Sequence, residues 1–103
     1  MVTRMDLHKI LCDILGSSNV YYQPPESMKI KYPGVVYFLD DIQPLFADDI
    51  KYKKDKRYTV TLITKDPEPD KFIDDILELK YCNFERSYVV ENLNHFVFEI
   101  IWQ

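Results

Sequence analysis

The spacing of apolar residues along the chain changes between helical and alternating patterns, and these changes divide it into elements. Between about residues 5 and 15 apolar residues recur every three or four positions, which predicts a helix, and Gly16 follows where a left-handed C-terminal cap belongs. A second helix is predicted from the sequence Asp-Pro-Glu-Pro-Asp at residues 66–70 to about Leu79. Three features favour that start: an Asp at the N-cap, prolines in the first turn, where a backbone N–H would have no partner in the helix, and an acidic side chain in the first turn.

Between these helices, runs of apolar and alternating residues predict strands. In order, we expect a short strand at 20–22, a central strand at 35–39 ended by Asp40 and Asp41, a broken strand at 43–53, a turn at 53–56, and a half-buried strand at 57–65. Pro24 and Pro25 remove ladder donors, so the strand at 20–22 should be an edge strand or run into an extended loop.

The C-terminal stretch predicts a β-hairpin. Apolar residues hold alternate positions on either side of a polar tetrapeptide: Cys82, Phe84, Tyr88 and Val90 before it, and Phe96, Phe98, Ile100 and Trp102 after it. Each strand should therefore have one apolar face for a core. The tetrapeptide at residues 92–95, Asn-Leu-Asn-His, is predicted to be the turn, because Asn tolerates left-handed backbone conformations.

The predicted order is α-β-β-β-β-α-β-β in a single domain over residues 1–103, with no repeat and no linker. Helices outside a mostly antiparallel sheet make this an α+β fold. Two helices can cover only one face of such a sheet. The other face must then meet solvent or a partner subunit.

Composition and charge narrow the class of function. The chain is 47% apolar, 29% charged and 15% aromatic, which is typical of a well-packed soluble domain. Its net charge of -4 argues against non-specific nucleic-acid binding by the whole surface. No apolar run approaches the roughly 20 residues that span a bilayer, and no secretory apolar region opens the sequence. We therefore expect no membrane partner, and synthesis and use in a cytoplasm.

Residues suited to catalysis or metal binding form no recognisable constellation in the sequence. Cys12 and Cys82 are expected to be buried free thiols; a disulfide or redox pair would need a proximity that the sequence does not show, and no Cys-x-x-Cys pair suggests zinc. His8 and His95 have no nucleophile signature beside them, and His95 more plausibly hydrogen-bonds the hairpin turn. Two glycines are too few for a phosphate-cradling loop. We predict no catalytic residue, metal or cofactor.

Charged clusters have simpler explanations than an active site. The acid pairs at 40–41, 48–49 and 74–75 are expected on solvated faces, because neighbours on a strand point in opposite directions. Pro69-Asp70 with Glu78-Leu79-Lys80 imitates a nuclease pattern, but both acids fall on one helix rather than on adjacent strands. A metal-dependent hydrolase is therefore disfavoured. The basic run at residues 51–57 favours a hairpin tip kept soluble by lysine over a nucleic-acid contact.

The amino-acid sequences and the spacing of several segments resemble those of a known protein family. These segments are VYYQPPES at 20–27, KYPGVVY at 31–37, RYTVTLI at 57–63 followed by Asp66-Pro67, CNFERSY at 82–88, and NLNHFVF at 92–98. Together they resemble the small tail-terminator (tail-completion) proteins of long-tailed, non-contractile bacteriophages. The resemblance covers about residues 7–102, and its order and spacing carry it, since no single segment is chemically specific.

The resemblance implies a structural virion protein without catalysis. Such a protein assembles with itself as a ring, usually of six subunits, on the major tail tube protein, stops tube polymerisation and offers the head connector a joining surface. DNA would pass through the ring without sequence-specific binding. The implied location is the virion, at the head–tail junction, after assembly in the host cytoplasm.

Two exposed segments are the predicted interaction surfaces. The first is the proline-led loop with Gln23, Pro24, Pro25, Met28, Lys29 and Lys31, and the second is the charged hairpin with Asp48, Asp49, Lys51, Lys53, Lys54, Lys56 and Arg57. Two alternatives stay open at this point. One is a head-completion or stopper protein at the same junction, and the other is a monomeric protein-binding module such as a regulatory adaptor.

Overall fold

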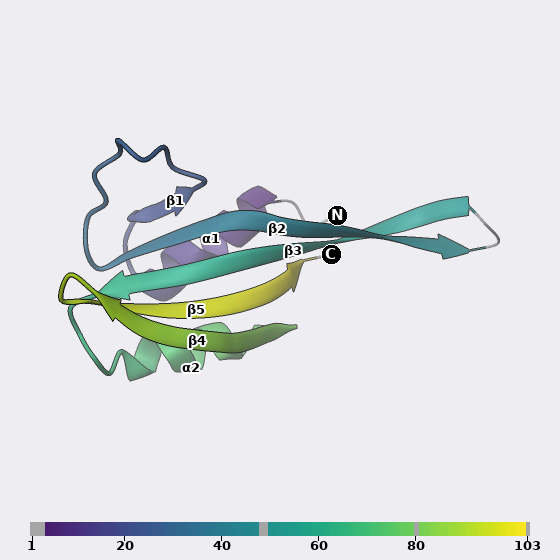
Figure 1. The fold of residues 1–103 in the computed structure, drawn as a ribbon. Coiled ribbons are helices and arrows are strands. Elements are labelled where there is room, and N and C mark those ends of the chain that lie inside the picture. Colours follow the sequence, from purple (N-terminus) through teal and green to yellow (C-terminus); the bar gives the residue numbers. More distant parts are fainter. Residues whose placement is uncertain (1–3, 48–49, 80, 103) are drawn as a thin grey trace.

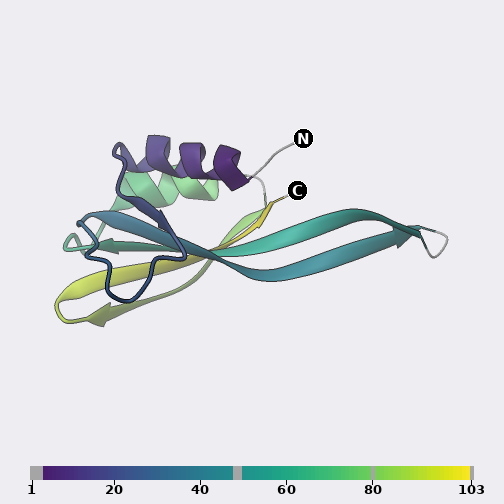
Figure 2. The same ribbon diagram turned by 90° about the horizontal axis from the view of Figure 1, so that it is seen from above.

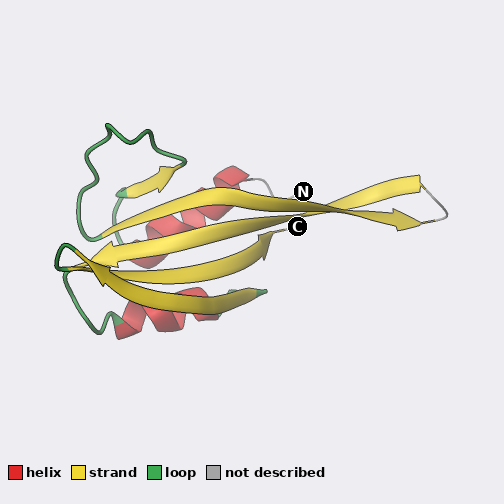
Figure 3. Cartoon of the chain, in the orientation of Figure 1, coloured by secondary structure: helices red, strands yellow, loops and turns green. Residues whose placement is uncertain are grey.

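The computed structural model describes residues 4–47, 50–79 and 81–102, with the backbone alone for 43–47 and 50–55. Two helices pack on a five-stranded, mostly antiparallel sheet, which confirms the predicted α+β class (Figures 1 and 3). The elements are α1 (Arg4–Leu15), β1 (Val20–Tyr22), β2 (Gly34–Ala47), β3 (Ile50–Thr64), α2 (Asp70–Leu77), β4 (Cys82–Val90) and β5 (Leu93–Trp102).

The strand order across the sheet is β1-β2-β3-β5-β4. β1 runs parallel to β2, and the three other pairs are antiparallel. β1 is a short edge strand, as the prolines that follow it predicted, and β4 is the opposite edge. Figure 2 shows α1 and α2 side by side on the same face of the sheet, so the prediction of one uncovered face is confirmed.

The core lies between this face and the helices. α1 contributes Leu7 and Leu11, α2 contributes Phe72 and Ile76, and the sheet contributes Val35, Tyr37, Tyr58, Val60, Leu62, Phe98 and Ile100. The sheet residues alternate along each strand with residues of the other face, as the period of two requires. Apolar burial of this kind stabilises by about 25 cal/mol per Å² removed from water.

The helix ends follow their local chemistry. α1 ends as predicted, because Gly16 takes a φ of 79° and its N–H donates to the Cys12 carbonyl at 2.8 Å. The predicted start of α2 at Asp66 is wrong. The Asp66 carboxylate instead accepts the Glu68 N–H at 2.9 Å in a turn, and the helix begins at Asp70 after an N-cap, Pro69, that has no side-chain cap.

The middle of the chain contains one strand fewer than predicted. Asp40 and Asp41 do not end β2, because a register shift between Leu39 and Asp41 bulges one residue out and the strand continues to Ala47. Residues 53–56 are not a turn but part of β3, which extends from Ile50 to Thr64 with one register shift between Lys51 and Lys53. The predicted broken strand at 43–53 is therefore the distal part of a single long β2–β3 hairpin.

The C-terminal hairpin turns earlier than predicted. Glu91 and Asn92 have φ of 53° and 65°, the positive values of a two-residue turn, and β5 already begins at Leu93. The prediction that the turn spans residues 92–95 is therefore wrong for its last three residues, which belong to β5. The Nδ1–H of His95 donates one local hydrogen bond to the Leu93 carbonyl at 3.1 Å, and the His95 ring stacks on Tyr88.

The β2–β3 hairpin makes the molecule long. Beyond the register pair Lys56–Trp102, β3 has no partner among the described residues of β5, so the hairpin continues alone past the described sheet. We call this part, residues 43–47 and 50–55, the ribbon (Figure 1). The overall extents are 51 × 30 × 23 Å, and the radius of gyration is 14.7 Å, above the roughly 13 Å of a compact domain of about 100 residues.

Candidate interaction surfaces

The sheet face turned away from the helices, which we call the open face, carries a mixture of apolar and polar side chains. Its members follow from the strand register, because directly paired residues share a face. They include Val36, Phe38, Asp41, Arg57, Thr59, Thr61, Ile63, Tyr88, Val90, His95, Val97, Glu99 and Ile101. No helix in the described part of the chain covers them (Figure 2).

Apolar side chains dominate the middle of the open face. Val97 is only 4% exposed and Ile63 only 8%, although neither belongs to the core under the helices. Around them, Phe38 and Tyr88 remain 40% and 41% exposed. An aromatic and aliphatic patch of this kind, ringed by polar residues, has the composition of the centre of a protein–protein interface.

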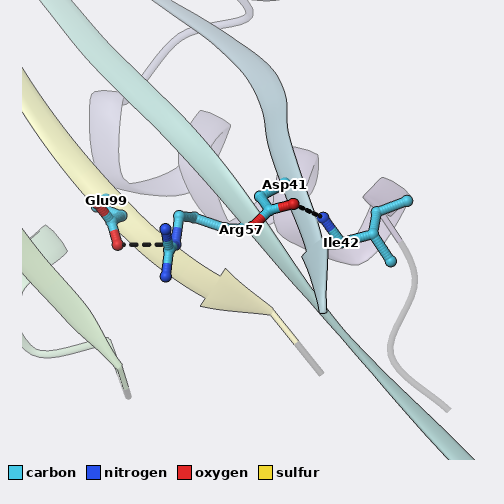
Figure 4. A network of polar contacts seen from close by, with 4 residues as sticks. All are labelled: Asp41, Ile42, Arg57 and Glu99. Carbon is cyan, nitrogen blue, oxygen red and sulfur yellow. Dashed lines mark hydrogen bonds and ion pairs between the residues drawn. The ribbon is translucent and has the colours of Figure 1, made fainter. Parts of the chain in front are cut away.

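An ion pair marks the end of the open face from which the ribbon extends. Arg57 Nε on β3 lies 3.0 Å from Glu99 Oε1 on β5, and the pairing is diagonal across the two strands (Figure 4). Nε is shielded from solvent without a well-aligned hydrogen bond, so we describe this contact as an ion pair. Asp41, directly across from Arg57, turns its carboxylate to the Ile42 N–H at 2.8 Å.

β4 is an exposed edge strand. A register shift between Phe84 and Arg86 bulges Glu85 out and reverses the faces of the residues after it. Tyr88 therefore pairs with His95 on the open face rather than pointing into the core, and every β4 residue except Cys82 is exposed. The prediction that β4 is half-buried with Phe84, Tyr88 and Val90 on one core face is wrong for this reason.

A small polar cluster joins α1 to the sheet. Tyr37 Oη accepts a hydrogen bond from Arg4 Nη1 at 3.0 Å, which leaves its own proton to donate to His8 Nδ1 at 2.8 Å. The Arg4 guanidinium also lies 4.3 Å from the centre of the Tyr22 ring. Burial, together with nearby Arg4, lowers the pKa of His8, and burial raises the pKa of Tyr37. The cluster positions α1 on β2 and contains no nucleophile.

The cysteines and a cleft between the two helices offer no catalytic constellation in the described residues. Cys12 and Cys82 are free but only partly buried, which corrects the prediction of full burial. Burial raises the pKa of the Cys82 thiol to about 11, so its reactive thiolate is scarce at neutral pH. A cleft of about 540 Å³ between the end of α1 and the start of α2 is lined by acids that include Asp13, Asp66 and Asp75. No cluster of ligands suited to a metal ion occurs among the described residues.

Comparison with known protein families and curated proteins found no match for this chain. Among the helices of the described residues, none is long and apolar enough to cross a membrane.

The structure places the two predicted interaction segments in different parts of the molecule. In the proline-led loop, Gln23, Pro25, Met28, Lys29 and Lys31 are exposed and Pro24 is half-buried. The side-chain Oε1 of Gln23 accepts a hydrogen bond from the Leu39 N–H at 3.2 Å, and the backbone N–H of Lys31 donates to the Tyr21 hydroxyl at 3.3 Å. The loop is therefore tied to β1 and β2, near the end of the sheet opposite the ribbon (Figure 1).

The second predicted segment belongs to the ribbon and its base. Lys51, Lys53 and Lys54 lie on the β3 strand of the ribbon, Lys56 and Arg57 pair with β5, and Asp48 and Asp49 lie outside the described residues. Sequence reasoning missed Phe38, Tyr88 and Val97 as surface-forming residues of the open face. A signal for them existed, because β2 and β5 carry apolar residues on both alternating sets of positions.

Proposed function

We propose that this chain is a structural protein of a phage tail, which forms a ring on the end of the tail tube, stops its polymerisation and joins it to the head connector. The proposal starts from the family resemblance of the sequence. The observation that supports it best is the open face, where an apolar patch with partly exposed Phe38 and Tyr88 has no covering helix. A surface of this kind is suited to burial in an interface with another protein.

The shape of the molecule is compatible with a ring. Each subunit of a closed ring uses two different patches, because its contact with the next subunit is heterologous. This chain has two unlike features at its two ends, the ribbon and the proline-led loop, with the open face between them. Its net charge of -4 would let DNA pass through a central channel without adhering to it.

The partners in this proposal are other copies of the chain, usually six in a ring, the major tail tube protein below and the head connector or stopper protein above. The exposed loop residues Met28, Lys29 and Lys31 and the ribbon lysines are the groups we assign to contacts with these partners. The proposed place of action is the head–tail junction of the virion, after assembly in the host cytoplasm.

The test is a virus that encodes this chain but cannot make it. Electron microscopy of its particles should show tails of abnormal and variable length that are not attached to heads, and a plasmid copy of the gene should restore the normal length. A plasmid copy carrying Phe38→Asp, which places a charge on the open face, should not restore it.

Two other outcomes would overturn the proposal. Tails of normal length beside heads that have lost their DNA would assign the chain to the stopper position of the connector. Normal particles in normal numbers would remove it from virion assembly and leave the protein-binding module as the remaining interpretation.

A further inference from the structure

The ribbon presents backbone hydrogen-bonding groups that its own sheet leaves unpaired. Along residues 50–55, β3 pairs with β2 on one edge only, since its pairing with β5 starts at Lys56. A two-stranded hairpin of this kind is marginally stable by itself, and three or more strands are needed for independent stability. The β3 edge of the ribbon therefore gains most from a further strand.

β4 presents the complementary feature at the side of the sheet. Its outer edge has no neighbouring strand in the described chain, and its nine residues contain no proline. Its exposed apolar residues include Phe84, Tyr88 and Val90, and Val89 is 64% exposed. Natural proteins usually protect such an edge with short strands, prolines or lysines, as β1 is protected here by its length and by Pro24 and Pro25. β4 lacks all three of these protections; its one protection is the bulge at Glu85, which leaves Arg86 to Val90 as a regular exposed edge.

Charge makes the ribbon complementary to the border of the molecule formed by α2 and β4. The segment at residues 50–57 contains five basic residues and one acid. The segment at residues 70–91 contains six acids and three basic residues; β4 itself has one acid and one base, so the acid excess lies on α2 and in the residues that flank β4. α2 lies beside β4 at that border of the molecule (Figure 1). This opposite charge favours the approach of the ribbon to the α2–β4 border, and the excess of lysine disfavours the pairing of two ribbons with each other.

The two edges cannot meet within one molecule. β5 separates β3 from β4, and the ribbon extends past the end of β5 (Figure 1). We propose that the β3 edge of the ribbon, residues 50–55, adds as a strand to the outer edge of β4 in a second copy of this chain. The contact is heterologous, so repetition gives a ring or a filament. It deepens the proposed function, because it rests on an assembly of like copies and names the contact between them.

Disulfide trapping tests this pairing directly. In a background with Cys12→Ala and Cys82→Ala, one variant carries Lys53→Cys and another carries Val89→Cys. Under mild oxidation at high protein concentration, a mixture of the two should give a mixed disulfide dimer, and neither variant alone should. The mixed yield should exceed by about tenfold that of Lys53→Cys with Ser18→Cys, an exposed loop position used as the control, because docking raises the local thiol concentration.

Three results would overturn the proposal. A disulfide dimer of the Val89→Cys variant alone, in equal yield, would mean that two β4 edges pair with each other. Equal yields with Val89→Cys and Ser18→Cys would mean random collision. No disulfide in any mixture would mean that the ribbon does not reach β4 of another copy.

A charge exchange provides a second, independent readout. In an otherwise native chain, Val89→Lys should abolish assembly in sedimentation velocity, because it adds a like charge and an edge-protecting lysine to β4. Adding Lys53→Glu and Lys54→Glu to the same chain should restore assembly, and failure to restore it contradicts the pairing. The virus experiment stays separate: a trapped contact with normal tails in the deletion virus would keep the pairing and remove the tail function, and the reverse result would do the opposite.

Discussion

Tyr37 shows how one residue can connect the core to a polar cluster. Its ring is fully buried beside Tyr22 and Tyr58, and its hydroxyl reaches Arg4 and His8. The hydroxyl can donate to His8 Nδ1 only while that nitrogen is unprotonated. The stability of the α1–β2 contact is thereby linked to the protonation of one histidine.

We predict that acid destabilises the protein through His8. Burial and Arg4 lower its pKa in the folded state, so the unfolded chain, with a pKa of about 6.5, binds a proton more readily. The contribution of neutral His8 is fully present above pH about 6.5 and is lost as pH falls below that value toward the folded-state pKa. The melting temperature should therefore be lower at pH 5.5 than at pH 7.5, which differential scanning calorimetry would measure. His8→Gln should reduce this pH dependence, and an equal fall in the variant would contradict the assignment.

A second prediction concerns Gly34, the first residue of β2. A Cβ at this position would collide with the Lys31 carbonyl oxygen, a backbone atom, and would press against the Ile30 side chain. Gly34→Ala should therefore lower the free energy of unfolding by about 1–3 kcal/mol, the usual cost of overpacking. Urea denaturation would measure it. Ser18→Ala, at an exposed loop position, is the control and should change stability by less than about 0.5 kcal/mol.

At the scale of elements, α2 is attached to the sheet by one face. Ile76 is fully buried and its neighbour Leu77 is 41% exposed. Ile76→Ala should cost about 2–5 kcal/mol through lost burial and a cavity, whereas Leu77→Ala should cost less than about 1 kcal/mol. Chemical denaturation of the two variants would test this difference. Equal losses would mean that α2 packs differently.

The elements also show what the sequence could predict. Both helices and the short edge strand could be predicted from the local sequence pattern, because Gly16 marks the end of α1 and the prolines at 24 and 25 mark the end of β1. The length of β2 and β3 did not follow, because acids and lysines at 40–41 and 53–56 resemble turn residues when their strand pairing is not known. Ladder pairing between distant residues overrode this local preference.

The candidate surfaces were predictable only in part. The loop and the lysine-rich hairpin are visible as polar segments. The orientation of β4 is not, because the bulge at Glu85 reverses the faces of Tyr88 and Val90 and a one-residue shift leaves no mark on an alternating pattern. The apolar patch on the open face depends in the same way on the register of three strands.

At the scale of the whole molecule, the open face and the core should respond to substitution independently. Phe38→Asp should leave the free energy of unfolding within about 0.5 kcal/mol, because Phe38 is 40% exposed and outside the core, yet it should abolish self-assembly. Calorimetry and light scattering together would measure both effects. Met5→Asp, at an apolar position on α1 that is 51% exposed, should leave assembly unchanged, and loss of assembly in both variants would contradict a specific role of the open face.

One further consequence follows from β3, which continues for 15 residues from the ribbon tip to the end of the sheet. A pull on the ribbon acts along the axis of β3, while the hydrogen bonds that hold this strand to β2 and β5 are perpendicular to it. The load is then a shear carried by all of these bonds together, rather than a peeling that breaks them one after another. The chain is thus built to resist tension applied at its ribbon.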